Sequence, residues 1–167
     1  MSTPSSHVAI IGAGTTSLVG ELIAAGYERI TTLDLSATAL ERLRASLGGA
    51  GDHIAFVVSN ACVDGAVSDV DVWHDRATFH FLVDDDSCAN YAIAAAHAVR
   101  SGGHLVMSQF APEGPAQCSG LPVRRHDERS LLAVFGEHFE LLESAVEVHV
   151  TPWGVEQPFV TTLLRRR

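Results

Sequence analysis

Short apolar runs alternate with helical patterns along most of this chain. Residues 7–11 form the first apolar run, and further runs rich in Val, Ile and Leu follow at 30–33, 54–58, 70–73 and 104–110. After the first run, Leu18, Val19, Leu22 and Ile23 recur at helical spacing, and the pattern ends at Gly26. Strands that alternate with helices are typical of a parallel sheet covered by helices, which is the architecture we predict.

Polar residues mark the ends of further helices. Ser36 is placed to cap a helix that carries Leu40, Leu43 and Leu47 and ends at the sequence GGAGD. The acidic sequence DDDS at 84–87 favours a helix N-terminus, and YAIAAAHAV continues that helix. The sequence SGG then breaks it before the fifth strand, and a shorter helix is predicted around 131–135.

Two long strand patterns end the chain. In the first, Val146, Val148 and Val150 alternate with Glu147, His149 and Thr151, so the valines share one face of the strand. Two consecutive strands after an alternating pattern predict a sheet that finishes with an antiparallel pair. The sequence contains no internal repeat or low-complexity segment.

Composition and charge narrow the function classes. With 167 residues, 47% of them hydrophobic, the chain suits a single domain over 1–167, with residues 1–6 as a disordered tail. A net charge of -9 argues against a nucleic-acid partner, and we interpret Arg165, Arg166 and Arg167 as a solvated tail. The sequence has no export signal and no apolar run long enough for a membrane, so we expect a cytoplasmic protein with no membrane partner. Three widely spaced cysteines fit reduced thiols.

The sequence VAIIGAGTTSLVGELIAAG at 8–26 is the first candidate for a binding site. Gly12 and Gly14 permit a tight turn after a strand, and Asp34 at the end of the next strand can accept both hydroxyls of an adenosine ribose. Both NAD and S-adenosylmethionine fit this arrangement. However, Ser17 stands where the dinucleotide pattern has a third small residue, and no second nucleotide-binding half follows.

Three longer motifs are more specific, namely DVWHDRATFHFL at 71–82, SGGHLVMSQFAPEGPAQCSGLPV from 101, and EVHVTPWGVEQPF from 147. With them, the chain from Val8 onward resembles a family of small bacterial class I S-adenosylmethionine-dependent methyltransferases. The resemblance implies a Rossmann-like sandwich with a mostly parallel seven-stranded sheet and an antiparallel C-terminal strand. It also implies S-adenosylmethionine as the cofactor and direct transfer of its methyl group to a small molecule or a protein side chain.

The resemblance also implies roles for individual residues. The cofactor would be bound by Gly12, Ala13, Gly14, Thr15, Asp34, Leu35 and Asn60. The catalytic candidates are His74, Asp75 and His80, because an imidazole titrates near neutral pH and a neighbouring carboxylate can orient it. Candidates for substrate binding are Arg76, Arg125, His126, His149 and Gln157.

Structural roles compete with these assignments. His74 and His80 can instead satisfy backbone carbonyls, and Arg76 can brace Asp71 or Asp75. Cys118 has no activating group nearby in the sequence, so we interpret it as a loop thiol. Nine histidines invite a metal site, but none has the paired spacing of a known motif, and we predict no metal.

Two features depart from the family pattern. Ile10 and Ile11 occupy the end of the first strand, where relatives carry an acidic residue, and only six residues precede His7, where relatives carry covering helices. We therefore expect an open site, unless a second copy of the chain or a partner protein covers it. Two alternatives to methyl transfer follow: changed chemistry, as in a cyclase, isomerase or hydrolase that uses His74, Asp75 and His80, or a noncatalytic partner subunit.

Overall fold

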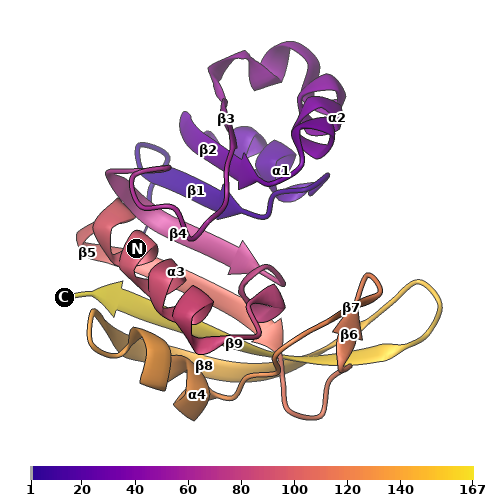
Figure 1. The fold of residues 1–167 in the computed structure, drawn as a ribbon. Helices are drawn as coiled ribbons and strands as arrows, with labels where there is room; N and C mark the ends of the chain where they lie inside the picture. Colours follow the sequence, from indigo (N-terminus) through magenta and orange to yellow (C-terminus); the bar gives the residue numbers. More distant parts are fainter. Residues whose placement is uncertain (1) are drawn as a thin grey trace.

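The computed structural model describes residues 2–167, and its main element is a seven-stranded sheet with the order β3-β2-β1-β4-β5-β9-β8 (Figure 1). The strands β3, β2, β1, β4 and β5 are parallel, whereas β9 runs antiparallel to both β5 and β8. This arrangement confirms the predicted fold class. The strands are β1 (His7–Ile11), β2 (Arg29–Asp34), β3 (Ala55–Val58), β4 (Val70–Arg76), β5 (Val99–Phe110), β8 (Phe139–Val150) and β9 (Glu156–Arg166).

Helices cover both faces of the sheet, and strand alternation divides the apolar side chains between two cores. Val8 and Ile10 of β1 pack with residues of α1 and α2, whereas Ala9 and Ile11 pack on the opposite face with residues of α3 and α4. The helices are α1 (Leu18–Ala24), α2 (Ala37–Leu47), α3 (Asp85–Ala98) and α4 (Glu128–Phe135), with 3₁₀ turns η1 (Gly48–His53) and η2 (Phe79–Phe81).

The predicted helix caps are present. The Ser36 hydroxyl accepts a hydrogen bond from the Ala39 amide at 3.2 Å, and the Asp84 carboxylate accepts one from the Ser87 amide at 2.8 Å. Each cap satisfies a backbone donor that has no partner inside the helix. Local sequence therefore determines where α2 and α3 begin.

Strand boundaries differ from the predictions where neighbouring strands decide them. β4 continues past Trp73 to Arg76, because β1 and β5 pair with it on both sides. β5 already begins at Val99, and the sequence SGG lies inside it as an irregularity opposite β4, where Gly102 adopts a φ of +77°. The glycines that were expected to separate a helix from a strand thus form a bulge.

The start of the chain also differs from the expected tail. The Ser6 amide donates to the Thr3 carbonyl at 2.8 Å, and the Glu28 amide donates to the Pro4 carbonyl at 3.4 Å. Residues 3–6 therefore form a turn that is joined to the segment before β2. Residue 1, which belongs to the predicted tail, lies outside the described residues.

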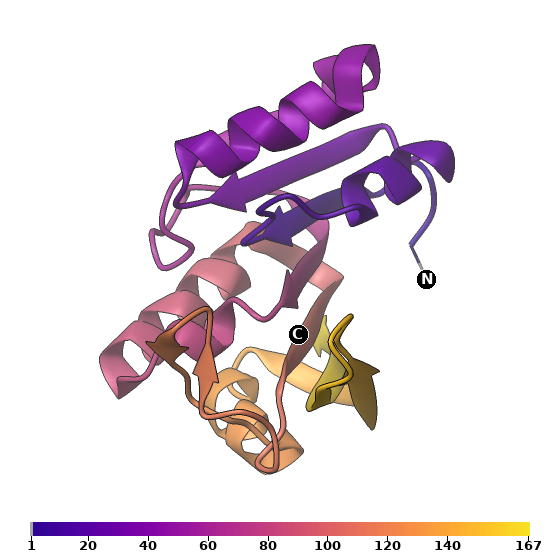
Figure 2. The same ribbon diagram turned by 90° about the vertical axis from the view of Figure 1, so that its right-hand side faces the viewer.

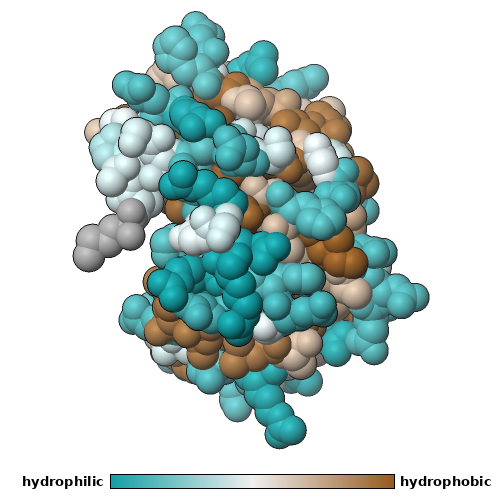
Figure 3. All heavy atoms as spheres, turned by 90° about the vertical axis from the view of Figure 1, so that its left-hand side faces the viewer, coloured by the Kyte–Doolittle hydropathy of each residue, from teal (hydrophilic) through white to brown (hydrophobic). Residues whose placement is uncertain are grey.

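All the parallel strands present their carboxyl ends at one edge of the sheet, which Figure 2 shows facing the viewer. The hairpin of β6 (Gln117–Cys118) and β7 (Leu121–Pro122) also lies at this edge. At the opposite edge, hydrophilic side chains spread across the centre of the surface (Figure 3). Within residues 2–167, no helix has the length and apolar character needed to cross a membrane.

Candidate active site

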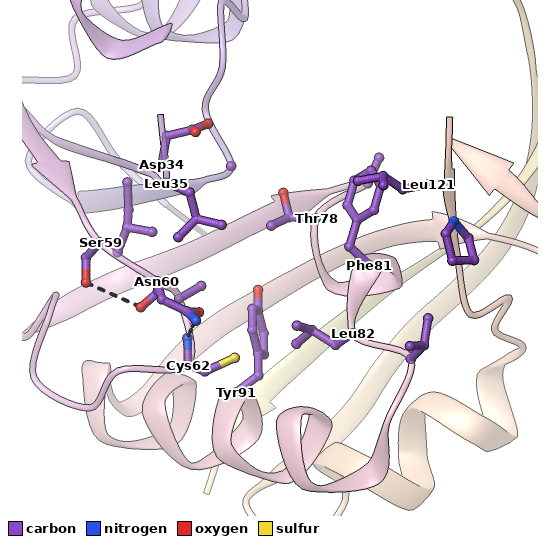
Figure 4. A pocket seen from close by; sticks show the side chains of 16 residues that line it. Asp34, Leu35, Ser59, Asn60, Cys62, Thr78, Phe81, Leu82, Tyr91 and Leu121 are labelled. Atoms are coloured by element: carbon purple, nitrogen blue, oxygen red, sulfur yellow. Dashed lines mark hydrogen bonds between the residues drawn. The ribbon is translucent and has the colours of Figure 1, made fainter. Parts of the chain in front are cut away.

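A cavity of roughly 550 Å³ opens at the carboxyl ends of the parallel strands, the edge at which open α/β sheets bind ligands. Asp34 and Leu35 lie at one end of it, Phe81 and Leu121 at the other, and Thr78 and Tyr91 between them (Figure 4). Its lining comes from the segments after β1 to β4, from α3 and from β7: Gly12, Leu33, Asp34, Leu35, Ser59, Asn60, Ala61, Cys62, Ala77, Thr78, Phe81, Leu82, Val83, Tyr91, Leu121 and Pro122.

The residues predicted to bind the cofactor divide into two groups. Gly12, Asp34, Leu35 and Asn60 line the cavity, whereas Ala13, Gly14 and Thr15 do not. Ala13 is buried, and its amide donates to the Leu33 carbonyl at 3.1 Å. The Gly14 amide donates to the Asp34 carboxylate at 2.8 Å. Two amides of the glycine turn are thus used to hold the turn against β2.

Gly12 is required by the close approach of the segment after β4. Its φ is +60°, and a Cβ at this position would stand 1.9 Å from the Thr78 hydroxyl oxygen. That hydroxyl donates to the Ile11 carbonyl at 3.1 Å, which fixes Thr78 against the end of β1. The glycine therefore lets two strand ends meet at the floor of the cavity.

Asp34 retains the capacity to bind a diol. One carboxylate oxygen accepts from Gly14 and the other from the Ser36 amide, each at 2.8 Å. A carboxylate has about four lone-pair sites, so about two remain for a ligand. Leu35, beside it, is 73% exposed and offers an apolar surface to a flat ring. These two residues fit the adenosine part of S-adenosylmethionine.

Asn60 presents a donor rather than a free acceptor. Its side-chain oxygen accepts from the Cys62 amide at 2.9 Å, which turns the chain after β3. The side-chain NH₂ group remains available at the cavity wall. Asn60 therefore offers a ligand its NH₂ group, because its side-chain oxygen is already engaged by the Cys62 amide.

The three catalytic candidates do not form one cluster, and none of them lines the cavity. His74 and Asp75 are consecutive in β4, so their side chains point to opposite faces of the sheet. The fourth apolar run was expected to end at residue 73, and the extension of β4 to Arg76 places both residues inside the strand. The hypothesis that Asp75 orients the imidazole of His74 is wrong, because the two side chains lie on opposite faces of β4.

Asp75 is instead the centre of a buried network. It is 0% exposed and accepts hydrogen bonds from the Tyr91 hydroxyl, from the Gln109 side chain at 2.8 Å and from the amides of Thr78 and Phe79. Burial raises the pKa of the Asp75 carboxyl, and these hydrogen bonds, with that of Tyr91 foremost, act against the rise. Asp75 thus positions the cavity wall without touching a ligand.

The histidines of this region are also withdrawn from the cavity. Burial and then the nearby Arg76 lower the pKa of His74, which lies on the other face of β4. His80 and His126 are 0% and 1% exposed, and burial lowers the pKa of each to about 4. Within the described residues, neither ring nitrogen of His80 has a hydrogen-bond partner. All three imidazoles are therefore neutral at pH 7.

The candidates for substrate binding lie elsewhere. The Arg76 guanidinium stacks 4.8 Å above the Phe159 ring, and the Arg125 guanidinium donates to the Pro112 carbonyl at 2.8 Å. His149 pairs with Gln157 across the hairpin of β8 and β9. His126 packs 5.0 Å from the Phe79 ring, measured between ring centres. None of these five residues lines the cavity.

Most residues of the apolar wall were not predicted from the sequence. Phe81, Leu82 and Val83 follow β4, Tyr91 lies on α3, and Leu121 and Pro122 belong to β7. The position of 81–83 at the end of a parallel strand is a signal that sequence reasoning can use. The contribution of β7 comes from a long loop and carries no comparable signal.

Comparison with known protein families gives one match. Residues 10–107 match a family described as methyltransferase domain. No curated protein sequence matches the chain.

Solved structures share the fold at low identity. A methyltransferase from Methanosarcina mazei matches with a TM-score of 0.82 and 14% identity over 99% of this chain and 94% of its own. The 1,6-didemethyltoxoflavin-N1-methyltransferase of Burkholderia thailandensis matches with 0.75 and 20% identity over 98% and 72%. A protein studied for conversion of a disulfide bond into a thioacetal group during echinomycin biosynthesis matches with 0.78 and 23% identity over 97% and 76%. Since the family match spans more than half of the sequence, the chain belongs to the methyltransferase domain family.

Proposed function

We propose that this methyltransferase domain transfers the methyl group of S-adenosylmethionine to an uncharged, largely apolar small molecule. The observation that carries the proposal is the division of the cavity. Among the described residues that line the cavity, Asp34 is the one with a charged side chain. It lies at the end with Leu35, whereas Phe81, Leu82 and Leu121 lie toward the other end (Figure 4). Val83 and Pro122 add to the apolar lining. A cation or a carboxylate at the apolar end would lose hydration without gaining a partner.

The cofactor is proposed to lie with its adenosine toward Asp34. The remaining lone pairs of that carboxylate accept from the ribose hydroxyls, and Leu35 packs against the adenine. When bound, S-adenosylmethionine supplies an electrophilic methyl group on a sulfonium. Thr78, which follows β4, then flanks the middle of the cavity, between the adenosine and the apolar end.

The chain's own residues align the reactants and exclude water. Phe81, Leu82 and Leu121 remove water from the acceptor, which favours in-line attack from a fixed position. Burial, followed by the nearby Asp75, raises the pKa of Tyr91 well above its ordinary value, so this phenol stays protonated. Burial likewise raises the pKa of the Cys62 thiol. Neither group is suited to act as a base, so an acceptor attacks with its own lone pair and releases any proton on the attacking atom to solvent.

The alternatives are less well supported. Non-methylating chemistry was expected from a cluster of His74, Asp75 and His80, and these side chains are directed to different surroundings. The relative from Burkholderia thailandensis is described with bound 1,6-didemethyltoxoflavin and S-adenosylhomocysteine. That description supports a small molecule, rather than a protein side chain, as the acceptor.

The unpaired thiols Cys62, Cys88 and Cys118 support a cytoplasmic location.

Calorimetric titration with S-adenosylmethionine and S-adenosylhomocysteine, with NAD as the control, tests the cofactor end. Saturable binding of both adenosyl ligands and none of NAD is expected. Asp34→Asn keeps part of the turn but weakens binding about tenfold or more, because charge-assisted hydrogen bonds contribute about 1.5–3 kcal/mol each. Wild-type protein that binds neither adenosyl ligand at millimolar concentration would refute the proposal.

A screen of acceptors tests the apolar end of the cavity, and each neutral compound in it is compared with the same compound carrying a carboxylate. Methyl transfer to neutral N-heterocycles, phenols or thiols is expected to exceed transfer to the same compounds carrying a carboxylate. With an acceptor in hand, Phe81→Ala lowers kcat/KM about tenfold or more, since a buried aromatic contact contributes about 1.5–3 kcal/mol. Arg76→Gln is the control, because Arg76 lies outside the cavity. Preference for carboxylated acceptors, lost in Arg76→Gln, would overturn the assignment.

A further inference from the structure

The outer edge of the sheet is a strand that carries a row of exposed valines. β8 is the last strand in the sheet order, and its other side has no pairing partner within residues 2–167. From Glu143 to Val150 nearly every residue is exposed. Figure 1 shows β8 and β9 as a long hairpin that extends past the parallel strands. An open strand edge presents a row of free backbone donors and acceptors.

The exposed side chains on this edge are valines in register. Val146, Val148 and Val150 are 68%, 55% and 56% exposed and lie on one face of the strand. Trp153, in the turn to β9, is 85% exposed. Soluble proteins usually protect such edges with charges, prolines or short strands, so a row of three valines here indicates a surface that is covered in the assembled protein.

The occupant that fits this edge best is a second copy of the same strand. Two identical strands can pair antiparallel around a two-fold axis, and directly opposed residues then lie on the same face of the joint sheet. With the axis at Val148, Val146 of each copy faces Val150 of the other, and the two Val148 side chains face each other. The same register places Glu147 opposite His149 of the second copy.

Neighbouring registers lack this complementarity. An axis at Ala145 places Glu143 opposite Glu147 of the second copy. An axis at Glu147 places the two Glu147 carboxylates opposite each other. Both registers are disfavoured, because like charges directly opposed are destabilising. An axis at Val146 leaves Val148 opposite Ser144. Among these axes, only the one at Val148 places valines opposite valines on one face and Glu147 opposite His149 on the other.

We propose that the protein forms a two-fold dimer in which the β8 strands pair antiparallel about Val148. The two seven-stranded sheets become one continuous sheet. This surface is separate from the cavity at the carboxyl edge, and the proposal does not depend on which acceptor the cavity binds.

Sedimentation velocity over a range of protein concentrations tests the dimer. Wild-type protein is expected to dimerise reversibly. Val148→Lys places two cations at the axis and weakens dimerisation more than about tenfold, because opposed like charges cost several kcal/mol in an interface. Ile93→Lys, at an exposed apolar position of α3, is the matched control and leaves the dimer unchanged. Circular dichroism and cofactor binding verify that both variants fold.

A charge exchange tests the register. Glu147→Lys alone weakens the dimer, because it removes the carboxylate opposite His149 of the second copy. Adding His149→Glu to that variant restores dimerisation, since the lysine then faces a carboxylate of the second copy. A wild-type protein that stays monomeric at every concentration, or that binds only a different protein, overturns the proposal. A dimer that Val148→Lys leaves intact, or that the double variant fails to restore, also overturns it.

Discussion

Acidification from pH 7 to pH 4 is expected to destabilise this protein through two buried histidines. His80 and His126 have pKa values of about 4, which burial lowers from the ordinary value near 6.5. In the unfolded chain these imidazoles take up protons below about pH 6.5, whereas in the folded protein they stay neutral until about pH 4. Their contribution to stability is therefore complete above about pH 6.5 and is lost as the pH falls toward 4.

The size of the effect follows from the difference between the two pKa values. Each histidine contributes up to about 3 kcal/mol over this range, because one pKa unit corresponds to about 1.4 kcal/mol. The loss of stability from both histidines, about 6 kcal/mol, falls at the lower end of the whole stability of a typical domain, about 5–15 kcal/mol. The N-terminal helix caps Asp84 and Asp127 do not counter it, since their hydrogen bonds to Ser87 and Ser130 lower their pKa values and move their loss to a more acidic range.

Urea unfolding followed by circular dichroism at a series of pH values, at one protein concentration, measures the effect. His80→Phe removes one titrating group but keeps an aromatic ring between Phe81 and Phe110, whose ring centres lie 4.6 and 4.8 Å from that of His80. This variant should lose about 3 kcal/mol less than wild type between pH 7 and pH 4. His53→Gln, at an exposed position, is the control. An unchanged pH dependence in His80→Phe would refute the reasoning.

Two further substitutions test the walls of the cavity. Asp75→Asn should lower the free energy of unfolding by about 3 kcal/mol. Every group that Asp75 contacts is a hydrogen-bond donor, so the new NH₂ group must oppose at least one of them. Urea unfolding measures the loss, and a value below about 1 kcal/mol contradicts the network. Gly12→Ala should destabilise the protein more than Gly14→Ala. Both glycines have positive φ, but only at Gly12 would a Cβ meet Thr78 at 1.9 Å. Thermal unfolding compares the two variants, and equal losses of stability would contradict the close approach.

The sequence was sufficient where the physics is local. Ser36 and Asp84 cap their helices with their own side chains, and the strand 7–11 is recognisable because it is buried on both faces. The ends of strands that are set by pairing with neighbouring strands were harder to predict from the sequence. Nothing within the sequence of β4 itself marks Arg76 as its end, because the three residues after Trp73 are polar and become strand only through pairing with β1 and β5.

The same cause explains the misplaced catalytic residues. Once His74 and Asp75 belong to one strand, alternation alone separates their side chains, whatever their chemistry. A run of His, Asp and Arg looks like an active-site loop because such residues are rarely buried, yet here Asp75 is buried with four donors around it. Asp75 of β4 therefore holds Tyr91, Thr78 and Phe79 in place without lining the cavity, and the side chains that line its apolar end follow the strand.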